Sequence, residues 1–230
     1  MPQVTLPGGR LLAYREYGDP RGVPVICNHG GLLCGHDVSP AHSAALSLGV
    51  RLISPDRPGV GSSTPEPGRR TADWAVDAEA LADHLHLERF GADGWAMGGQ
   101  CGWALGAVLP RRTFAVVVVA GCRPQPAPAQ LNPTDRRFLR LSSASPAAAA
   151  VAFGAIRTMA RVTPGLVVSM TARTLCPADR DVLGHLPAGA FAEWMAAAMS
   201  VASGMVEEYR ALGRSWGFAL RDVQAPTTYW

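Results

Sequence analysis

The chain has 230 residues, of which 48% are hydrophobic and 17% are charged, and its formal net charge is +3. This composition indicates one packed domain, or one domain with a sizeable insertion, and excludes a disordered chain. With no run of eighteen apolar residues and no basic-then-apolar leader, we expect no transmembrane helix, no signal peptide and a cytoplasmic protein. The scattered basic residues favour neither a nucleic-acid partner nor a membrane partner.

The cysteines are odd in number and lack the spacing of a zinc site or a disulfide framework. We therefore expect them to be reduced and mostly buried. No metal and no organic cofactor is implied by any motif. The five are Cys27, Cys34, Cys101, Cys122 and Cys176.

The first quarter of the chain alternates short apolar runs with turn residues. Residues 4–6 and 11–17 flank Pro7-Gly8-Gly9, which predicts a β-hairpin. Residues 23–27 predict a buried strand that ends at a glycine loop, and residues 50–54 predict a second one. Between these two strands, residues 40–48 are expected to form a short helix.

The next segment continues the alternation of helix and strand. Thr71 begins the clearest helical pattern, which runs through Leu87. Residues 90–95 predict a strand, residues 97–109 a helix of small residues, and residues 113–120 a central strand that is apolar on both faces. Alternating strands and helices predict a parallel sheet with right-handed crossovers.

The pattern changes after Gly121. Prolines at 124, 126, 128 and 133 predict a linker. Residues 135–212 are helical and alanine-rich, with 147–161 and 188–212 as the longest predicted helices. Residues 218–223 and 225–230 are expected to return to the sheet.

One short segment carries the sharpest signal for function. In Gly94-Trp95-Ala96-Met97-Gly98-Gly99, a predicted strand leads into a predicted helix, which is the context of a nucleophile elbow. Glycines at 94 and 98 fit such a turn, because a Cβ on either would collide with the adjoining strand or helix. Close packing of a strand on a helix explains the same glycines equally well when the segment is considered alone.

Two further loops follow neighbouring strands in a matching order. His29-Gly30-Gly31 follows the strand at 23–27, where a glycine loop can aim a backbone N–H at a developing oxyanion. Gly31 or Leu32 would supply one such donor and Met97, at the start of a helix, the other. A turn-rich loop, residues 56–63, follows the strand at 50–54.

Together with the strand at 116–121, these motifs resemble the α/β-hydrolase superfamily, in its single-domain type with a helical cap. The resemblance covers residues 10–123 closely and 213–230 more loosely. It implies a mostly parallel α/β sheet, with a core over 1–123, a helical cap over 124–217 and a return to the sheet over 218–230. It also implies that the last strand and its flanking helices are missing.

The same resemblance implies a catalytic triad whose three positions are vacant here. Position 96, where the family has serine, is alanine. The acid and the histidine of the family would follow strands beyond Trp230, and Gly121-Cys122-Arg123-Pro124 offers no earlier carboxylate. His185 is the only histidine past the elbow and falls among the cap helices. Cys101, Ser62 and Ser63 are poor substitutes as nucleophiles, because no base accompanies them.

Loss of the serine alone costs on the order of 10⁶ in turnover, whereas an oxyanion hole and a pocket can leave roughly 10³–10⁴ over water. We therefore expect a relative of enzymes that hydrolyse an ester-like bond in a small apolar substrate, here a fragment or an inactivated version. The alternative is a non-catalytic binding or partner protein, or one half of a split hydrolase. Expected partners are a small apolar molecule and either a second chain that completes the sheet or a homodimer. A cyclase or lyase without a serine is a minor possibility.

Overall fold

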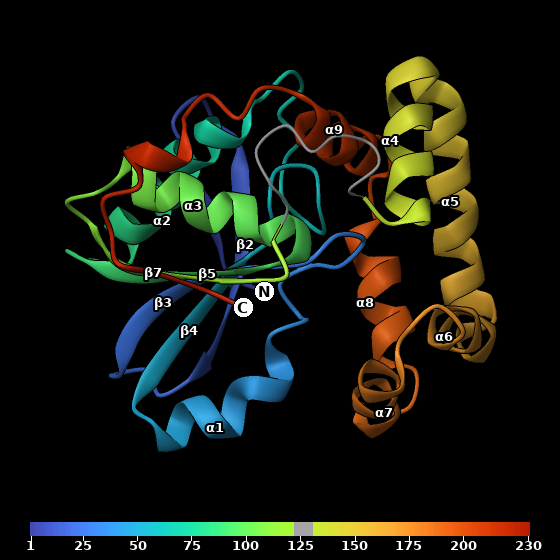
Figure 1. Ribbon diagram of the computed structural model, residues 1–230, viewed down its shortest axis with the longest axis horizontal. Coiled ribbons are helices and arrows are strands. Elements are labelled where there is room, and N and C mark those ends of the chain that lie inside the picture. The colour runs from blue at the N-terminus through green and yellow to red at the C-terminus, as the bar shows by residue number, and fades with distance from the viewer. Residues whose placement is uncertain (122–130) are drawn as a thin grey trace.

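A seven-stranded sheet forms the centre of the computed structural model, which describes residues 1–121 and 131–230 (Figure 1). Its strand order is β1-β2-β4-β3-β5-β6-β7. The strands are β1 (Gln3–Thr5), β2 (Leu11–Gly18), β3 (Val23–Asn28), β4 (Val50–Pro55), β5 (Phe90–Trp95), β6 (Thr113–Val119) and β7 (Thr227–Tyr229). The α/β fold class predicted from the sequence is confirmed.

The sheet is antiparallel at one end and parallel over the rest. β1 and β2 form the predicted hairpin, whose turn contains Gly8 and Gly9 with φ values of +86° and +84°. β2 pairs antiparallel with β4, and all later pairs are parallel. Because β3 lies between β4 and β5, the loops that follow these three strands meet at one edge of the sheet.

Helices cover both faces of the sheet. α1 (His42–Ser47) packs on β2 and β4 from one side, and α2 (Trp74–His84) and α3 (Gly99–Val108) lie on the other side (Figure 1). α3 approaches β6 closely, because a Cβ at Gly106 would lie only 2.8 Å from Cγ2 of Val116. In place of the helix predicted from Thr71 through Leu87, a 3-10 turn, Thr71–Asp73, leads into α2, which ends at His84, and His86 takes a left-handed φ of +55°.

β6, which the sequence predicts as a central strand that is apolar on both faces, is buried on one face only. Val116 and Val118 are buried beneath α3, whereas Val117 and Val119 are 37% and 40% exposed. Side chains alternate across a strand, so the two exposed valines belong to the opposite face. Within the described ranges, that face of β6 has no covering helix.

Residues 133–213 form six helices beside the sheet: α4 (Pro133–Ala144), α5 (Pro146–Val162), α6 (Pro164–Ala172), α7 (Pro177–His185), α8 (Ala190–Ala198) and α9 (Ala202–Gly213). In Figure 1 most of them stand apart from the sheet as a separate layer, and α9 leads back toward it. No single described helix is long and apolar enough to cross a membrane. α5 and α6 pass that test only as a pair bent by 111°.

Two sequence expectations for this helical region were wrong in detail. Pro133 begins α4 instead of ending a linker, because proline suits the first turn of a helix and the Asn132 side chain accepts from the N–H of Asp135. Residues 188–212 are two helices rather than one, since Val201 is extended with φ −116° and ψ 101°. Positions 122, 124, 126 and 128 lie outside the described residues.

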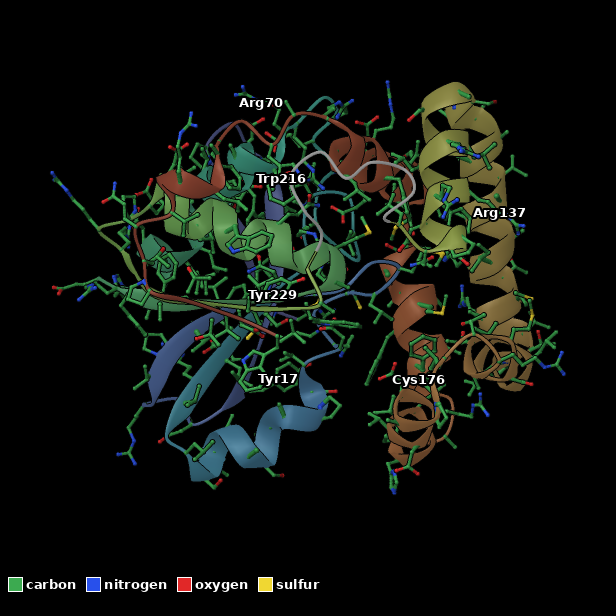
Figure 2. All side chains as sticks on the ribbon, viewed as in Figure 1. Tyr17, Arg70, Arg137, Cys176, Trp216 and Tyr229 are labelled. Carbon is green, nitrogen blue, oxygen red and sulfur yellow. The ribbon has the colours of Figure 1, made fainter. Side chains whose placement is uncertain are left out.

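The return to the sheet is shorter than the sequence predicts. Residues 218–223 contain a 3-10 turn, Leu220–Asp222, and only β7 joins the sheet, parallel to β6. Trp103 of α3 anchors this segment: its ring stacks on Tyr229 at 5.9 Å and lies 5.8 Å from Trp216. Figure 2 labels Trp216 and Tyr229 close to α3.

Two groups of buried side chains hold the molecule together. One joins the sheet to α2 and α3 around Trp74, Phe90 and Leu105. The other fills the helical region around Phe153 and Tyr209 and includes Met97, which directly follows position 96. The elbow segment therefore lies where the two cores meet.

Candidate functional site

Ala96 occupies a sharp turn between β5 and α3. Trp95 before it is extended, Ala96 itself has φ +49°, and a short 3-10 turn, Ala96–Gly98, leads into the helix. A Cβ at Gly94 would overlap the carbonyl oxygen of Gly98, and one at Gly98 would overlap that of Asn28. The backbone thus has the shape of a nucleophile elbow, and its apex has a methyl group where a hydroxyl would stand.

The glycine loop that follows β3 lies directly against this elbow. A Cβ on Gly30 would come within 2.7 Å of the Trp95 ring, and one on Gly31 within 2.5 Å of the Met97 sulfur. Leu32, the next residue, has a left-handed φ of +60°. A side chain at position 30 would therefore push the loop away from the Trp95 ring, whereas one at position 31 would first have to displace the flexible end of the Met97 side chain.

His29 is built into this loop through both ring nitrogens. Nδ1 lies 2.9 Å from the carbonyl oxygen of Gly30, which can only accept, and Nε2 lies 3.2 Å from the backbone N–H of Arg57, which can only donate. Nδ1 therefore carries the proton. Burial, together with the charge of Arg57, lowers the pKa of His29 to about 3. The ring is neutral at physiological pH and has no nitrogen left to act as a base.

The hydrogen bonds of the Gly30 carbonyl fix the direction of the next N–H. This carbonyl accepts from Nδ1 of His29 at 2.9 Å and from Nη2 of Arg57 at 3.4 Å. In a planar trans peptide, the C=O and the following N–H point in opposite directions. The N–H of Gly31 therefore points away from His29 and Arg57, while Gly31 itself lies beside Met97.

Asp37 clamps the glycine loop to the elbow. Its Oδ2 accepts from the backbone N–H of Gly30 at 2.9 Å and from Nε1 of Trp95 at 2.8 Å. Burial raises the pKa of this carboxyl group to about 6, although both hydrogen bonds lower it. Its Oδ1 is buried without a partner among the described residues. Asp37 could not be predicted from the sequence, because an aspartate in a loop gives no local sign of such a contact.

A buried ion cluster ties α9 to the same loop. Glu208 of α9 accepts from Arg57 at 2.8 Å and also from Arg69, and the three side chains are at most 4% exposed. Nη1 of Arg57 also donates to the carbonyl oxygen of His29 at 2.5 Å. The two arginines hold the pKa of Glu208 at about 2, against the effect of burial. One carboxylate of α9 thus orients the arginine that holds the glycine loop.

The loop after β4 has a structural role in this arrangement. Asp56, which is fully buried, accepts from Arg15 at 2.7 Å and from the N–H of Gly35 at 2.8 Å. The Ser63 hydroxyl donates to the carbonyl of Asp56 at 2.6 Å and accepts from the N–H of Ala13. Ser63 is therefore a turn residue with a committed hydroxyl, and Ser62 is exposed in the same turn.

The other histidines and cysteines in the described part of the chain lie in structural or surface positions. His42 accepts from the N–H of Gly18 at 3.0 Å, and the ring of His185 is 77% exposed on α7. Cys27, Cys34 and Cys101 are buried, and burial raises the pKa of each thiol. Cys176 is exposed before α7 (Figure 2). Within the described ranges, no three histidine, cysteine or acidic side chains gather in a way that could hold a metal ion.

A large cavity of about 940 Å³ lies away from the elbow, between α5, α6 and α8. Its walls include neither Ala96 nor Gly31 nor Met97. The elbow, the glycine loop and this cavity are thus separate features of the described structure.

Comparison with known proteins identifies the class. The model of the alpha/beta hydrolase fold family matches residues 23–145, which is more than half of the chain. The chain belongs to the α/β-hydrolase family.

The similar curated proteins are enzymes of varied chemistry. A non-heme chloroperoxidase of Streptomyces lividans is 30% identical over 135 residues, which cover 58% of this chain and 49% of that protein. A 3-hydroxybutyrate-oligomer hydrolase of Cupriavidus necator is 31% identical over 135 residues, 56% of this chain and 45% of that protein. The chain spans about half the length, or less, of the curated relatives it matches.

Solved structures share the fold over nearly the whole chain. The enol-lactonase of Burkholderia xenovorans superimposes with a TM-score of 0.67 at 18% identity, covering 99% of this chain and 80% of that one. An epoxide hydrolase of Vigna radiata gives 0.71 at 19% identity, with 99% and 78% covered. At these identities the likeness establishes the fold alone, since one fold serves many reactions.

Proposed function

We propose that the chain binds a small apolar carbonyl compound, such as an ester, beside the elbow without hydrolysing it through a covalent intermediate. The observation that carries the proposal is Ala96 itself. Its backbone keeps the left-handed turn and the glycine neighbours of an elbow, but a methyl group cannot attack a carbonyl. Whatever lies beyond position 230, acyl transfer through residue 96 is not available.

Two backbone donors support the binding part of the proposal. Met97 is in the first turn leading into α3, where N–H groups have no partner within the helix. The N–H of Gly31 points away from the groups that hold the Gly30 carbonyl. Together they would polarise a carbonyl oxygen placed between them, with Leu32 as the neighbouring third candidate. The ester and lactone chemistry of several relatives makes a carboxylic ester the natural first ligand.

The experiment compares ethyl butyrate with an ether of equal length. Binding is followed by the fluorescence of Trp95, which adjoins Ala96 and is 39% exposed, and the Trp95→Phe variant identifies its signal. Two hydrogen bonds to the ester carbonyl, each about 1 kcal/mol, predict at least tenfold tighter binding of the ester. Equal affinities would remove the support for the two donors. Protein-dependent hydrolysis of the ester, blocked by a serine-reactive phosphonate, would overturn the proposal outright.

A second candidate is a partner protein whose sheet is completed by another polypeptide. The observation in its favour is the exposed apolar surface on the face of β6 opposite α3, where Val117 and Val119 are 37% and 40% exposed. Light scattering of the purified chain tests for a homodimer. Val117→Lys and Val119→Lys would dissociate such a dimer, and a monomer at all concentrations would exclude the homodimer.

A further inference from the structure

The cavity between α5, α6 and α8 is separate from the elbow, and its walls combine apolar and cationic groups. Its volume of about 940 Å³ is within the range of small-molecule sites. Small apolar residues such as Ala160, Val168 and Ala196 form much of the wall. Figure 1 shows α5 and α8 side by side, with α6 packed near their ends. Such a space suits an alkyl or aryl group.

Two arginines on one face of α5 also line this cavity. Arg157 and Arg161 are four residues apart, so their side chains are neighbours on the helix and repel each other. Neither forms an ion pair with any residue in the described part of the chain, and Nε of Arg157 is buried without a partner. The C-terminal end of the α5 dipole favours cations, but it does not supply a hydrogen-bond acceptor for the buried Nε of Arg157.

The beginnings of two more helices add to the positive potential. α6 begins at Pro164, which has no N–H, and its N-cap Thr163 makes no side-chain cap. The N–H of Gly165, in the cavity wall, therefore has no helical partner. α8 begins after Gly189, also in the wall and without a capping side chain. Helix N-termini favour anions, so they and the arginines favour the same ligand charge.

One acidic residue limits how much negative charge the site would accept. Glu193, in the first turn of α8, lines the same cavity and makes no ion pair with the described residues. Two arginines against one glutamate leave one net positive charge. A monoanion balances that charge, whereas a dianion would exceed it next to a carboxylate.

From these walls and charges we propose that the cap cavity binds an amphipathic monocarboxylate, with its carboxylate at Arg157 and its apolar chain along α6 and α8. The planar guanidinium group pairs with a carboxylate through two parallel hydrogen bonds. This inference goes beyond the proposed function, because it involves neither Ala96 nor the two backbone donors.

The test measures decanoate and decan-1-ol binding by calorimetry on the 230-residue chain. Decanoate is expected to bind at least tenfold tighter, because charge-assisted hydrogen bonds to arginine are absent with the alcohol. Arg157→Gln should weaken decanoate binding roughly tenfold to a hundredfold and leave decan-1-ol unchanged. Arg173→Gln is the matched control: it removes the same charge from an exposed cap position outside the cavity wall.

A second pair of variants tests the cavity independently of charge. Gly165 lines the cavity, and a Cβ there meets nothing within 4 Å, so Gly165→Leu should fold normally and add a bulky side chain at the cavity wall. It should abolish binding of both ligands. Gly154→Leu, on α5 and equally unobstructed but outside the wall, should change neither. Equal affinities for decanoate and decan-1-ol, or unchanged binding in Gly165→Leu, would overturn the proposal. Neither result bears on the ester–ether comparison at the elbow.

Discussion

Glu208→Gln is the most informative single substitution for the link between α9 and the glycine loop. Glu208 is the shared partner of Arg57 and Arg69, and these side chains are at most 4% exposed. Glutamine keeps the size of the side chain but removes its charge. Two buried guanidinium groups would then lack their carboxylate, and Arg57 would lose the group that orients it toward the carbonyl of His29.

The expected cost follows from the burial of the cluster. Removing one partner of a buried ion pair destabilises a protein by about 3–5 kcal/mol. The lowered pKa of Glu208 agrees in sign, because it means that the folded state favours the charged carboxylate. For a chain of this size, such a loss lowers Tm by roughly 6–20 °C. The free energy of unfolding from urea titration and Tm from calorimetry measure it.

The pH dependence provides an independent check with a definite sign. The folded pKa of Glu208 lies below its ordinary value, so its stabilisation is complete above about pH 4.5 and is lost as the pH falls toward 2. The variant should therefore lose less stability than the parent across this acid range. Glu207→Gln, on the same helix, is the control. Its partners Arg210 and Arg214 are 39% and 27% exposed, so it should cost about 1 kcal/mol. If Glu208→Gln cost no more than Glu207→Gln, the buried cluster would not be the link described above.

Three further predictions concern the elbow and its clamp. Ala96→Ser in the 230-residue chain should not produce hydrolysis of a p-nitrophenyl ester, because both nitrogens of His29 are already committed; a large gain in rate would contradict that reasoning. Ala96→Gly should raise stability by about 1 kcal/mol and Tm by roughly 2–4 °C, because alanine is strained at φ +49°; a lower Tm would show that the turn is not strained. The raised pKa of Asp37 means that the folded state binds this proton more tightly than the unfolded state, so the parent should lose stability as the pH rises from about 4 to about 6. Asp37→Asn should not show this loss, and parallel stability curves for parent and variant would count against it.

The sequence predicted those features that depend on local patterns. The elbow could be located because Gly94 and Gly98 must lack a Cβ wherever a strand turns sharply into a helix. The hairpin and the strands up to β6 followed from alternation and turn residues in the same way. The break between α8 and α9 was missed, because the apolar pattern continues through Met199 while the backbone at Val201 is extended.

Long-range polar contacts could not be predicted. Glu208 and Arg57 are 151 residues apart, and neither has a neighbour in sequence that indicates the other. Asp37 lies in a loop with no periodicity, and its contact with Trp95 exists only because the glycine loop packs on the elbow. Similarly, the cavity depends on how α5, α6 and α8 pack. The sequence therefore did not indicate that Arg157 and Arg161 line a common cavity.

In this chain the backbone turn of a nucleophile elbow occurs without a nucleophilic side chain at its apex, whereas serine hydrolases have both. Its backbone is held by contacts that involve no residue-96 hydroxyl: Gly98 lies against the carbonyl of Asn28, Gly31 against Met97, and Asp37 joins Gly30 to Trp95. Packing alone therefore maintains the sharp turn, at a cost of about 1 kcal/mol for alanine in the left-handed region. It follows that an elbow-shaped turn is evidence for the fold, while evidence for hydrolysis must come from the side chain at its apex.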